Sequence, residues 1–261
     1  MVMHVIREGQ GRPLVLVHGL GSDSGSWRPV WDLLSAEREV IAVDLPGHGD
    51  TPPLEVNTIA TFADALGAFL ADSGLTGADL VGSSVGGRLV LELARRGHGG
   101  AVVALDPGGF WENAGARYIG WTLGASVRAV GALDRFLPTL TANPVTRSAL
   151  LVQLSARPWR LSQQFALAEL RKFAGTAVFA EVLHDLVHGP RQGGMPAGTA
   201  SNRMMIAWGG RDRVTLPRRQ AARARSAFPD ADFHLFDNSG HFPLWDTPVA
   251  TAELILSATG R

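Results

Sequence analysis

Three side chains that together can perform nucleophilic catalysis occur along this sequence in the order serine, aspartate, histidine. Ser84 is at the centre of a Gly-Ser-Ser-Val-Gly sequence, Asp212 ends a Trp-Gly-Gly-Arg-Asp sequence, and His241 follows Ser-Gly. A serine nucleophile needs a base to take its proton, and a histidine base needs an acceptor on its far nitrogen. These residue types therefore make Ser84 a candidate nucleophile, His241 a candidate base and Asp212 a candidate acid.

The residues around Ser84 predict a strand, a tight turn and a helix. Leu80 and Val81 form a short apolar run before the turn, and apolar residues recur at helical spacing in 89–94. The flanking glycines leave room for a strained residue between strand and helix. The start of the following helix favours negative charge that develops beside Ser84.

The rest of the chain alternates apolar runs with helical periodicity, as in a mainly parallel sheet with helices on both faces. The runs expected as strands are 13–17, 39–44, 101–106, 203–208 and 231–236. Residues 3–7 and 13–17 predict a β-hairpin that opens the sheet. Helical spacing predicts helices over 59–73, 119–133, 145–154, 161–174, 178–187 and 248–256.

Several of these segments resemble the α/β-hydrolase superfamily. The Gly-Ser-Ser-Val-Gly turn resembles its nucleophile elbow, residues 18–21 match its HGxG turn, and 44–51 resemble its D-x-x-G-x-G-x-S segment with Thr51 in place of serine. The resemblance implies the α/β-hydrolase fold, a mainly parallel β-sheet flanked by helices with an inserted all-helical cap. It divides the chain into a core of 1–110 and 198–261 and a cap of 111–197. It also implies an oxyanion hole made by the backbone N–H groups of Leu20 and Val85.

Other residues leave alternatives open. Asp106 also follows an expected strand, where some family members place the acid, and its other reading is a turn residue before Pro107. His184 and His188 lie one helical turn apart, superficially like a metal-binding pair. With no third ligand nearby, they are instead expected to interact with the carboxyl end of their helix.

Composition limits the partners. Of the 261 residues, 46% are hydrophobic and 18% charged, and 24 basic residues balance 24 acidic ones, so no nucleic acid or anionic membrane partner is expected. There is no cysteine, which excludes disulfides and a cysteine nucleophile. We find no signal peptide pattern and no apolar run of about eighteen residues, which predicts a cytoplasmic protein. The oligomeric state is open.

The leading hypothesis is a serine hydrolase that cleaves a carboxylic ester or lactone of a small to medium, largely apolar substrate through an acyl-enzyme on Ser84. No cofactor or metal is expected. Aromatic residues of the expected cap either line the pocket or form the cap's own core; they are Phe110, Trp111, Tyr118, Trp121, Trp159, Phe165, Phe173 and Phe179.

Two other functions fit the same residues. One is carbon–carbon bond hydrolysis or lyase chemistry on a diketone, which members of the resembled family perform. A carboxylate on such a substrate would bind cap arginines that otherwise form solvated helix faces: Arg117, Arg128, Arg157 and Arg160. Arg88, which follows the elbow directly, is another candidate. The other is a ligand receptor on a hydrolase scaffold.

Overall fold

One seven-stranded sheet is the centre of the computed structural model, which describes residues 2–200 and 202–260. Its order is β1-β3-β2-β4-β5-β6-β7, and all neighbouring pairs except β1 with β3 are parallel. The strands are β1 (Val5–Glu8), β2 (Pro13–Val17), β3 (Glu39–Val43), β4 (Asp79–Ser83), β5 (Val102–Leu105), β6 (Met204–Gly209) and β7 (Asp232–Phe236). The predicted mainly parallel sheet is confirmed.

The predicted hairpin between the first two strands is wrong. β1 pairs antiparallel with β3, from Val5 opposite Val43 to Glu8 opposite Val40, whereas β2 lies between β3 and β4. The burial of the strands explains this order. Four of the five residues of β2 are buried, as in an interior strand covered on both faces, whereas three of the four residues of β1 are exposed and suit an edge.

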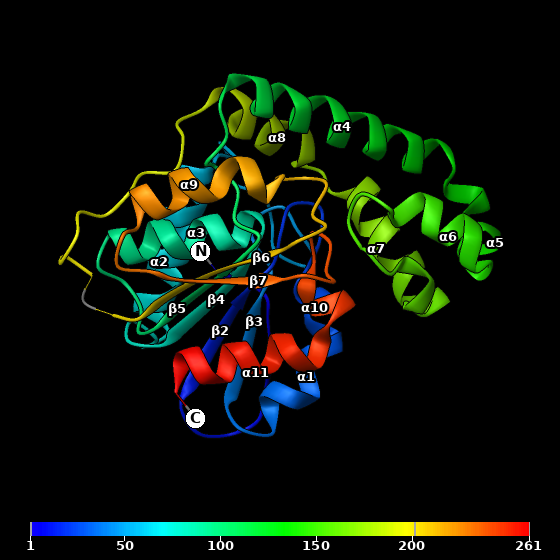
Figure 1. The fold of residues 1–261 in the computed structure, drawn as a ribbon. Helices are drawn as coiled ribbons and strands as arrows, with labels where there is room; N and C mark the ends of the chain where they lie inside the picture. The colour runs from blue at the N-terminus through cyan, green and yellow to red at the C-terminus, as the bar shows by residue number, and fades with distance from the viewer. Residues whose placement is uncertain (1, 201, 261) are drawn as a thin grey trace.

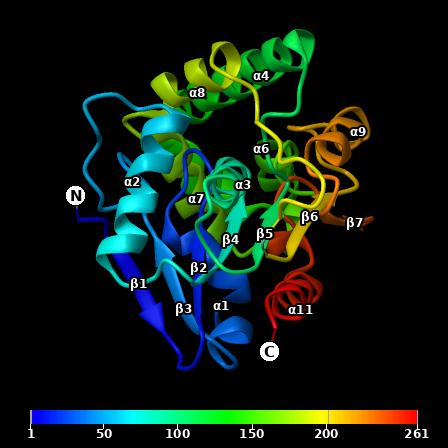
Figure 2. The same ribbon diagram turned by 90° about the vertical axis from the view of Figure 1, so that its left-hand side faces the viewer.

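Helices cover both faces of the sheet. Figures 1 and 2 show α1 (Arg28–Ser35) and α11 (Pro248–Thr259) on one face, and α2 (Ile59–Asp72), α3 (Val85–Arg95) and α9 (Pro217–Ala227) on the other. The short helix α10 (Pro243–Asp246) precedes α11. This layering matches the predicted fold class, in which parallel strands are covered on both faces.

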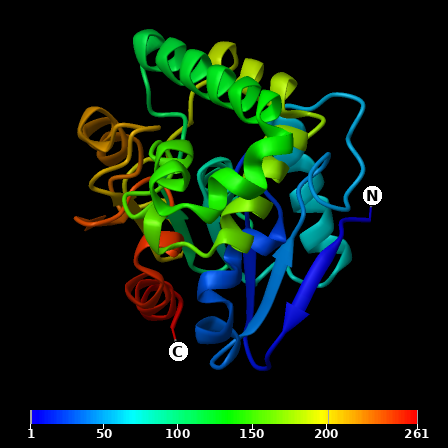
Figure 3. The ribbon, with the colours of Figure 1, turned by 90° about the vertical axis from the view of Figure 1, so that its right-hand side faces the viewer.

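Five helices lie between β5 and β6. They are α4 (Asn113–Ala132), α5 (Leu137–Ala142), α6 (Pro144–Leu151), α7 (Gln163–Gly175) and α8 (Phe179–His188). Figures 1 and 3 show them gathered at one end of the sheet. The helical periodicity of this region is thus confirmed, whereas its role as a cap with bounds 111–197 stays a prediction. None of the described helices combines the length and apolarity needed to cross a bilayer.

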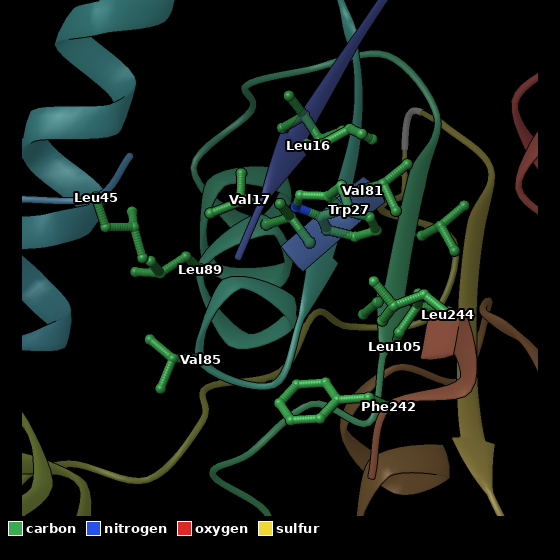
Figure 4. Packing of buried hydrophobic residues seen from close by; sticks show 14 of the residues in the cluster. Leu16, Val17, Trp27, Leu45, Val81, Val85, Leu89, Leu105, Phe242 and Leu244 are labelled. Atoms are coloured by element: carbon green, nitrogen blue, oxygen red, sulfur yellow. The ribbon is translucent and has the colours of Figure 1, made fainter. Parts of the chain in front are cut away.

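The strands before and after the elbow have a closely packed apolar core. Leu16, Val81 and Leu105 on the central strands are fully buried, and Figure 4 shows them with Trp27 among the side chains of one apolar cluster. Leu89 of α3 is fully buried as well. Because packed interiors resist displacement, this core holds the β4–α3 turn in a fixed position.

Candidate active site

Ser84 occupies a strained turn between β4 and α3. Its φ of 56° and ψ of −112° are unusual for a residue with a side chain, and such a conformation costs on the order of 1–3 kcal/mol. The neighbouring glycines permit the turn. A Cβ on Gly82 would lie 2.1 Å from the carbonyl oxygen of Gly86, and one on Gly86 would lie 2.0 Å from that of Val17. The backbone therefore places the Ser84 hydroxyl at the end of the sheet, as the sequence predicts.

A chain of hydrogen bonds joins the three predicted side chains. His241 Nε2 lies 2.8 Å from Ser84 Oγ, and His241 Nδ1 lies 3.0 Å from Asp212 Oδ2. A carboxylate accepts the Nδ1 proton, so the Nε2 lone pair faces the serine hydroxyl and can accept its proton. His241 and Asp212 are both buried, which keeps water from competing for these bonds.

Asp212 is held as a carboxylate by its neighbours. Its Oδ1 accepts the backbone N–H groups of Val214 at 2.6 Å and Thr215 at 3.1 Å, and the Thr215 hydroxyl donates to Oδ2. Burial alone would raise the pKa of Asp212, but the attraction of His241 and these hydrogen bonds lower it below its usual value. Asp212 therefore carries a negative charge toward His241.

Asp106, the alternative acid, lies close to the same histidine. A carboxylate oxygen of Asp106, a carboxylate oxygen of Asp212 and a ring nitrogen of His241 all lie within 4.8 Å of one another. The Asp106 Oδ1 accepts the Gly209 N–H at 2.9 Å, and the His241 hydrogen bond to a carboxylate goes to Asp212. Burial, followed by the negative charge of Asp212, raises the pKa of Asp106 well above its usual value. The geometry thus favours Asp212 as the acid, and the raised pKa of Asp106 favours its neutral form.

The loop after β2 lies directly against Ser84. A Cβ on Gly19 would lie 3.1 Å from Ser84 Cβ, and Leu20 and Val85 line the same cavity as Ser84. His18 fixes this loop, because its Nδ1 donates to the Gly19 carbonyl at 2.7 Å and its Nε2 accepts the Leu45 N–H at 3.0 Å. The positions are compatible with the expected oxyanion hole, whose assignment to Leu20 and Val85 stays a prediction.

The cavity beside Ser84 has mainly apolar walls. Residues from α4, α7, α8 and the loops at the end of the sheet all contribute to it. Of the aromatic residues singled out in the sequence, Trp111, Phe173 and Phe179 line it, whereas Trp121 and Trp159 are exposed. An apolar cavity beside a nucleophile is the usual form of a small-molecule site.

Two carboxylates that the sequence did not indicate support the site. Glu169 of α7 lines the cavity, where it accepts a hydrogen bond from the Ser22 hydroxyl at 3.0 Å and pairs with Lys172 at 2.8 Å. Asp246 accepts the Gly240 N–H at 2.7 Å and the Ser155 hydroxyl at 2.6 Å, which holds the loop that carries His241. Glu169 lies on a helix predicted from periodicity alone and Asp246 ends the short helix α10, so neither role could be found without the tertiary fold.

None of the arginines proposed to bind a substrate carboxylate lines the Ser84 cavity. Arg117, Arg128 and Arg160 are exposed, and Arg157 is half-buried. Arg88 is buried but lines a different cavity. His184 and His188 are exposed, and among the described residues neither belongs to a group of three potential metal ligands.

Acid should weaken the fold through His48, whose Nδ1 donates to the Pro46 carbonyl at 3.0 Å. Burial, assisted by His18, lowers the pKa of His48 to about 3. The unfolded chain titrates near 6.5, so between these values the unfolded state binds more protons and the free energy of unfolding falls as pH falls. The contribution is at most about 1.4 kcal/mol per pH unit.

Urea unfolding between pH 5 and 7 measures this effect. His48→Asn should flatten the pH dependence relative to the native chain, whereas His184→Asn, at an exposed site, should leave it unchanged. All variants share the same carboxylates, so comparing the slopes of unfolding free energy against pH removes the contribution of those carboxylates. An unchanged slope in His48→Asn would show that His48 is not held neutral by burial.

The sequence matches the model of the alpha/beta hydrolase family over residues 14–254. The chain therefore belongs to this family, as its motifs predicted. It is 30% identical over 242 residues to a dihydrolipoyllysine-residue acetyltransferase component of the acetoin cleaving system from Cupriavidus necator. The alignment covers 90% of this chain but 60% of that relative, so this chain spans less than two thirds of the relative's length.

Two solved structures share the fold over nearly the whole chain. A thermophilic esterase from Thermogutta terrifontis matches with a TM-score of 0.75 and 21% identity, covering 98% of this chain and 92% of the esterase. A meta-cleavage product hydrolase from Pseudomonas fluorescens matches with a TM-score of 0.73 and 19% identity, covering 98% and 93%. The similarity places this chain on a fold that carries both esterases and carbon–carbon bond hydrolases.

Proposed function

We propose that the protein is a serine hydrolase that cleaves a carboxylic ester or lactone of a small to medium, largely apolar substrate. The observation that carries this proposal is the continuous hydrogen-bonded chain from Asp212 through His241 to Ser84 at the wall of an apolar cavity. Membership of the alpha/beta hydrolase family supports it.

In the first half of the proposed reaction, Ser84 Oγ attacks the carbonyl carbon while His241 Nε2 accepts the hydroxyl proton. The carbonyl oxygen becomes negative and accepts hydrogen bonds from the N–H groups of Leu20 and Val85, each of which is worth about 3 kcal/mol in comparable sites. The imidazolium is stabilised by Asp212. His241 then gives its proton to the alcohol as the carbon–oxygen bond breaks.

In the second half, water hydrolyses the acyl-enzyme. His241 accepts a proton from water, the hydroxide adds to the acyl carbon, and the resulting intermediate expels Ser84 Oγ, which regains the proton from His241. The same N–H groups bind the second oxyanion. For a lactone, the leaving alcohol stays attached to the acyl group and departs with the acid product.

The walls of the cavity support an apolar substrate. The helices α4–α8 act as a cap in this proposal, and Trp111, Phe173 and Phe179 contact the substrate's apolar part. Among the described wall residues only Glu169 has an acidic side chain. It shares Lys172 with Asp23, so one negative charge is left over, and this charge repels a substrate carboxylate. In the diketone alternative, a cap arginine would bind a carboxylate of the substrate. None of the cap arginines lines this cavity.

A panel of nitrophenyl esters tests the proposal. Acyl chains from acetate to decanoate should be hydrolysed with an optimum at short to medium length, set by the size of the cavity. The hemisuccinate ester, which carries a carboxylate, should be turned over more slowly than the butyrate ester. Absence of turnover with every ester would contradict the proposed function.

Glu169→Gln should relax the discrimination against the charged ester. We expect kcat/KM for the hemisuccinate to rise about tenfold relative to butyrate, which corresponds to about 1.4 kcal/mol. Ser22→Ala is the matched control, because it removes a hydrogen bond to Glu169 and keeps the charge. An unchanged ratio of the two esters in Glu169→Gln would show that Glu169 does not set this preference.

A further inference from the structure

Arg88 is a buried cation whose hydrogen bonds are incomplete. It lies one helical turn after Ser84 on α3, where 4% of the residue is exposed. Its Nη2 donates to the Pro190 carbonyl at 2.5 Å, but its Nε and Nη1 have no partner among residues 2–200 and 202–260. Burial lowers the pKa of Arg88 to about 10, so the group stays charged at neutral pH.

Arg191 is a second cation beside the same space. Its guanidinium donates to the carbonyls of Val187 and Gly189 and to Asn113 Oδ1. Within the part of the chain that the structure describes, neither Arg88 nor Arg191 forms a salt bridge. Burial has the largest effect on the pKa of Arg88, whereas the negative charge of Asp185 attracts Arg88 and raises this pKa and the positive charge of Arg191 lowers it.

Both arginines line a cavity of about 420 Å³, which we call the arginine pocket. It lies between α3, the start of α2 and the segment 190–193 that follows α8, and it shares no lining residue with the Ser84 cavity. Arg95 and Arg96 also line it but are already paired with Glu92, and Arg96 is paired with Asp64 as well.

The charges of the arginine pocket do not balance. Its four arginines are accompanied by three carboxylates, Glu92 and Asp185 in the lining and Asp64 paired with Arg96, which leaves one positive charge in excess. A buried charge is normally compensated by a partner, because its removal from water is unfavourable. The planar guanidinium matches the oxygens of phosphate and carboxylate, to which it can donate two parallel hydrogen bonds.

We propose that the arginine pocket is an anion site for a phosphate group, either inorganic phosphate or the phosphate of a monoester, bound between Arg88 and Arg191. A phosphate supplies the missing negative charge and several acceptor oxygens, whereas a single carboxylate has fewer oxygens for two guanidinium groups. Bound phosphate would tie the segment 190–193 to α3, the helix that begins at the Ser84 turn. The site goes beyond the proposed hydrolysis and does not depend on it.

Thermal unfolding in the presence of phosphate tests the site. The midpoint Tm of the native protein should rise with inorganic phosphate and saturate in the millimolar range, at constant ionic strength set with sodium chloride. Phosphate also stabilises proteins without a site, because it is excluded from their surfaces. The test is therefore whether the phosphate-dependent rise in Tm differs between the native chain and variants of the arginine pocket.

Arg191→Gln, at a half-buried position, should lose most of the saturable shift, and Arg88→Met should lose it as well. Arg117→Gln, an exposed arginine of α4, should keep it. If Arg88→Met does not fold, Arg191→Gln and isothermal titration of the native protein with phosphate decide the matter. Equal shifts in the native chain, Arg191→Gln and Arg117→Gln, or no heat of binding with 20 mM phosphate, would overturn the proposal.

Titration with phenyl phosphate distinguishes the two sources of the phosphate. A larger Tm shift than with inorganic phosphate at equal concentration would assign the pocket to a monoester. A smaller shift, with inorganic phosphate still saturable, would assign it to free phosphate. All of these readouts are independent of ester hydrolysis, so they stand or fall separately from the function of Ser84.

Discussion

Ser84→Ala should abolish ester hydrolysis while leaving the fold intact. We expect kcat to fall about 10⁶-fold, the scale found when the serine of a protease triad is removed, because no other group is placed to form the acyl-enzyme. The substitution removes one half-buried oxygen and keeps a side chain of similar size, so the thermal midpoint should change little. Initial rates with nitrophenyl butyrate and a thermal melt measure both quantities.

Ser83→Ala is the matched control for this variant. Ser83 is the neighbouring residue at the end of β4, and its hydroxyl has no hydrogen-bond partner among the described residues. Its substitution should leave kcat within about threefold of the native value. Equal activity of Ser84→Ala and the native protein would exclude Ser84 as the nucleophile.

Asp212→Asn should have the second largest effect. The amide cannot hold His241 in the tautomer that accepts the serine proton, and the comparable change in a serine protease lowers kcat about 10⁴-fold. Asp106→Asn should lower kcat less than about tenfold, because the His241 Nδ1 hydrogen bond goes to Asp212, whereas Asp106 accepts the Gly209 N–H. Steady-state kinetics at pH 8 compare the two variants.

The pair of variants also decides between the two acids. A loss in Asp106→Asn as large as that in Asp212→Asn would mean that Asp106 is the acid or shares the role. Residual activity of Asp212→Asn that disappears in the double variant would mean that Asp106 ionises and replaces Asp212. Our expectation is that the double variant is no less active than Asp212→Asn alone.

The elbow could be predicted from sequence because its causes are local. The glycines at 82 and 86 are required by contacts within a few residues and with the adjacent strand, and parallel strands bring their carboxyl ends to one edge. Asp212 and His241 each follow such an end, so their meeting with Ser84 follows from topology. Helical periodicity was equally informative, because it depends only on neighbours in the chain.

Features that depend on distant contacts could not be predicted. The first two strands have the spacing of a hairpin, yet β1 pairs with β3, and β2 pairs with β3 and β4, which follow much later in the chain. Glu169 has the sequence context of an exposed helical residue, and only the packing of α7 against the loop at Ser22 places it in the cavity. The unbalanced charge beside Arg88 likewise depends on segments about one hundred residues apart.

Covalent labelling of Ser84 would test the proposed nucleophile most directly. A fluorophosphonate reacts with a serine that is activated by a histidine base, and intact-mass spectrometry followed by peptide mapping locates the adduct. We predict one equivalent of label on Ser84 in the native protein, slow labelling in His241→Ala and none on residue 84 in Ser84→Ala. Label on another residue, or the same extent of labelling in the native protein and Ser84→Ala, would contradict a catalytic Ser84.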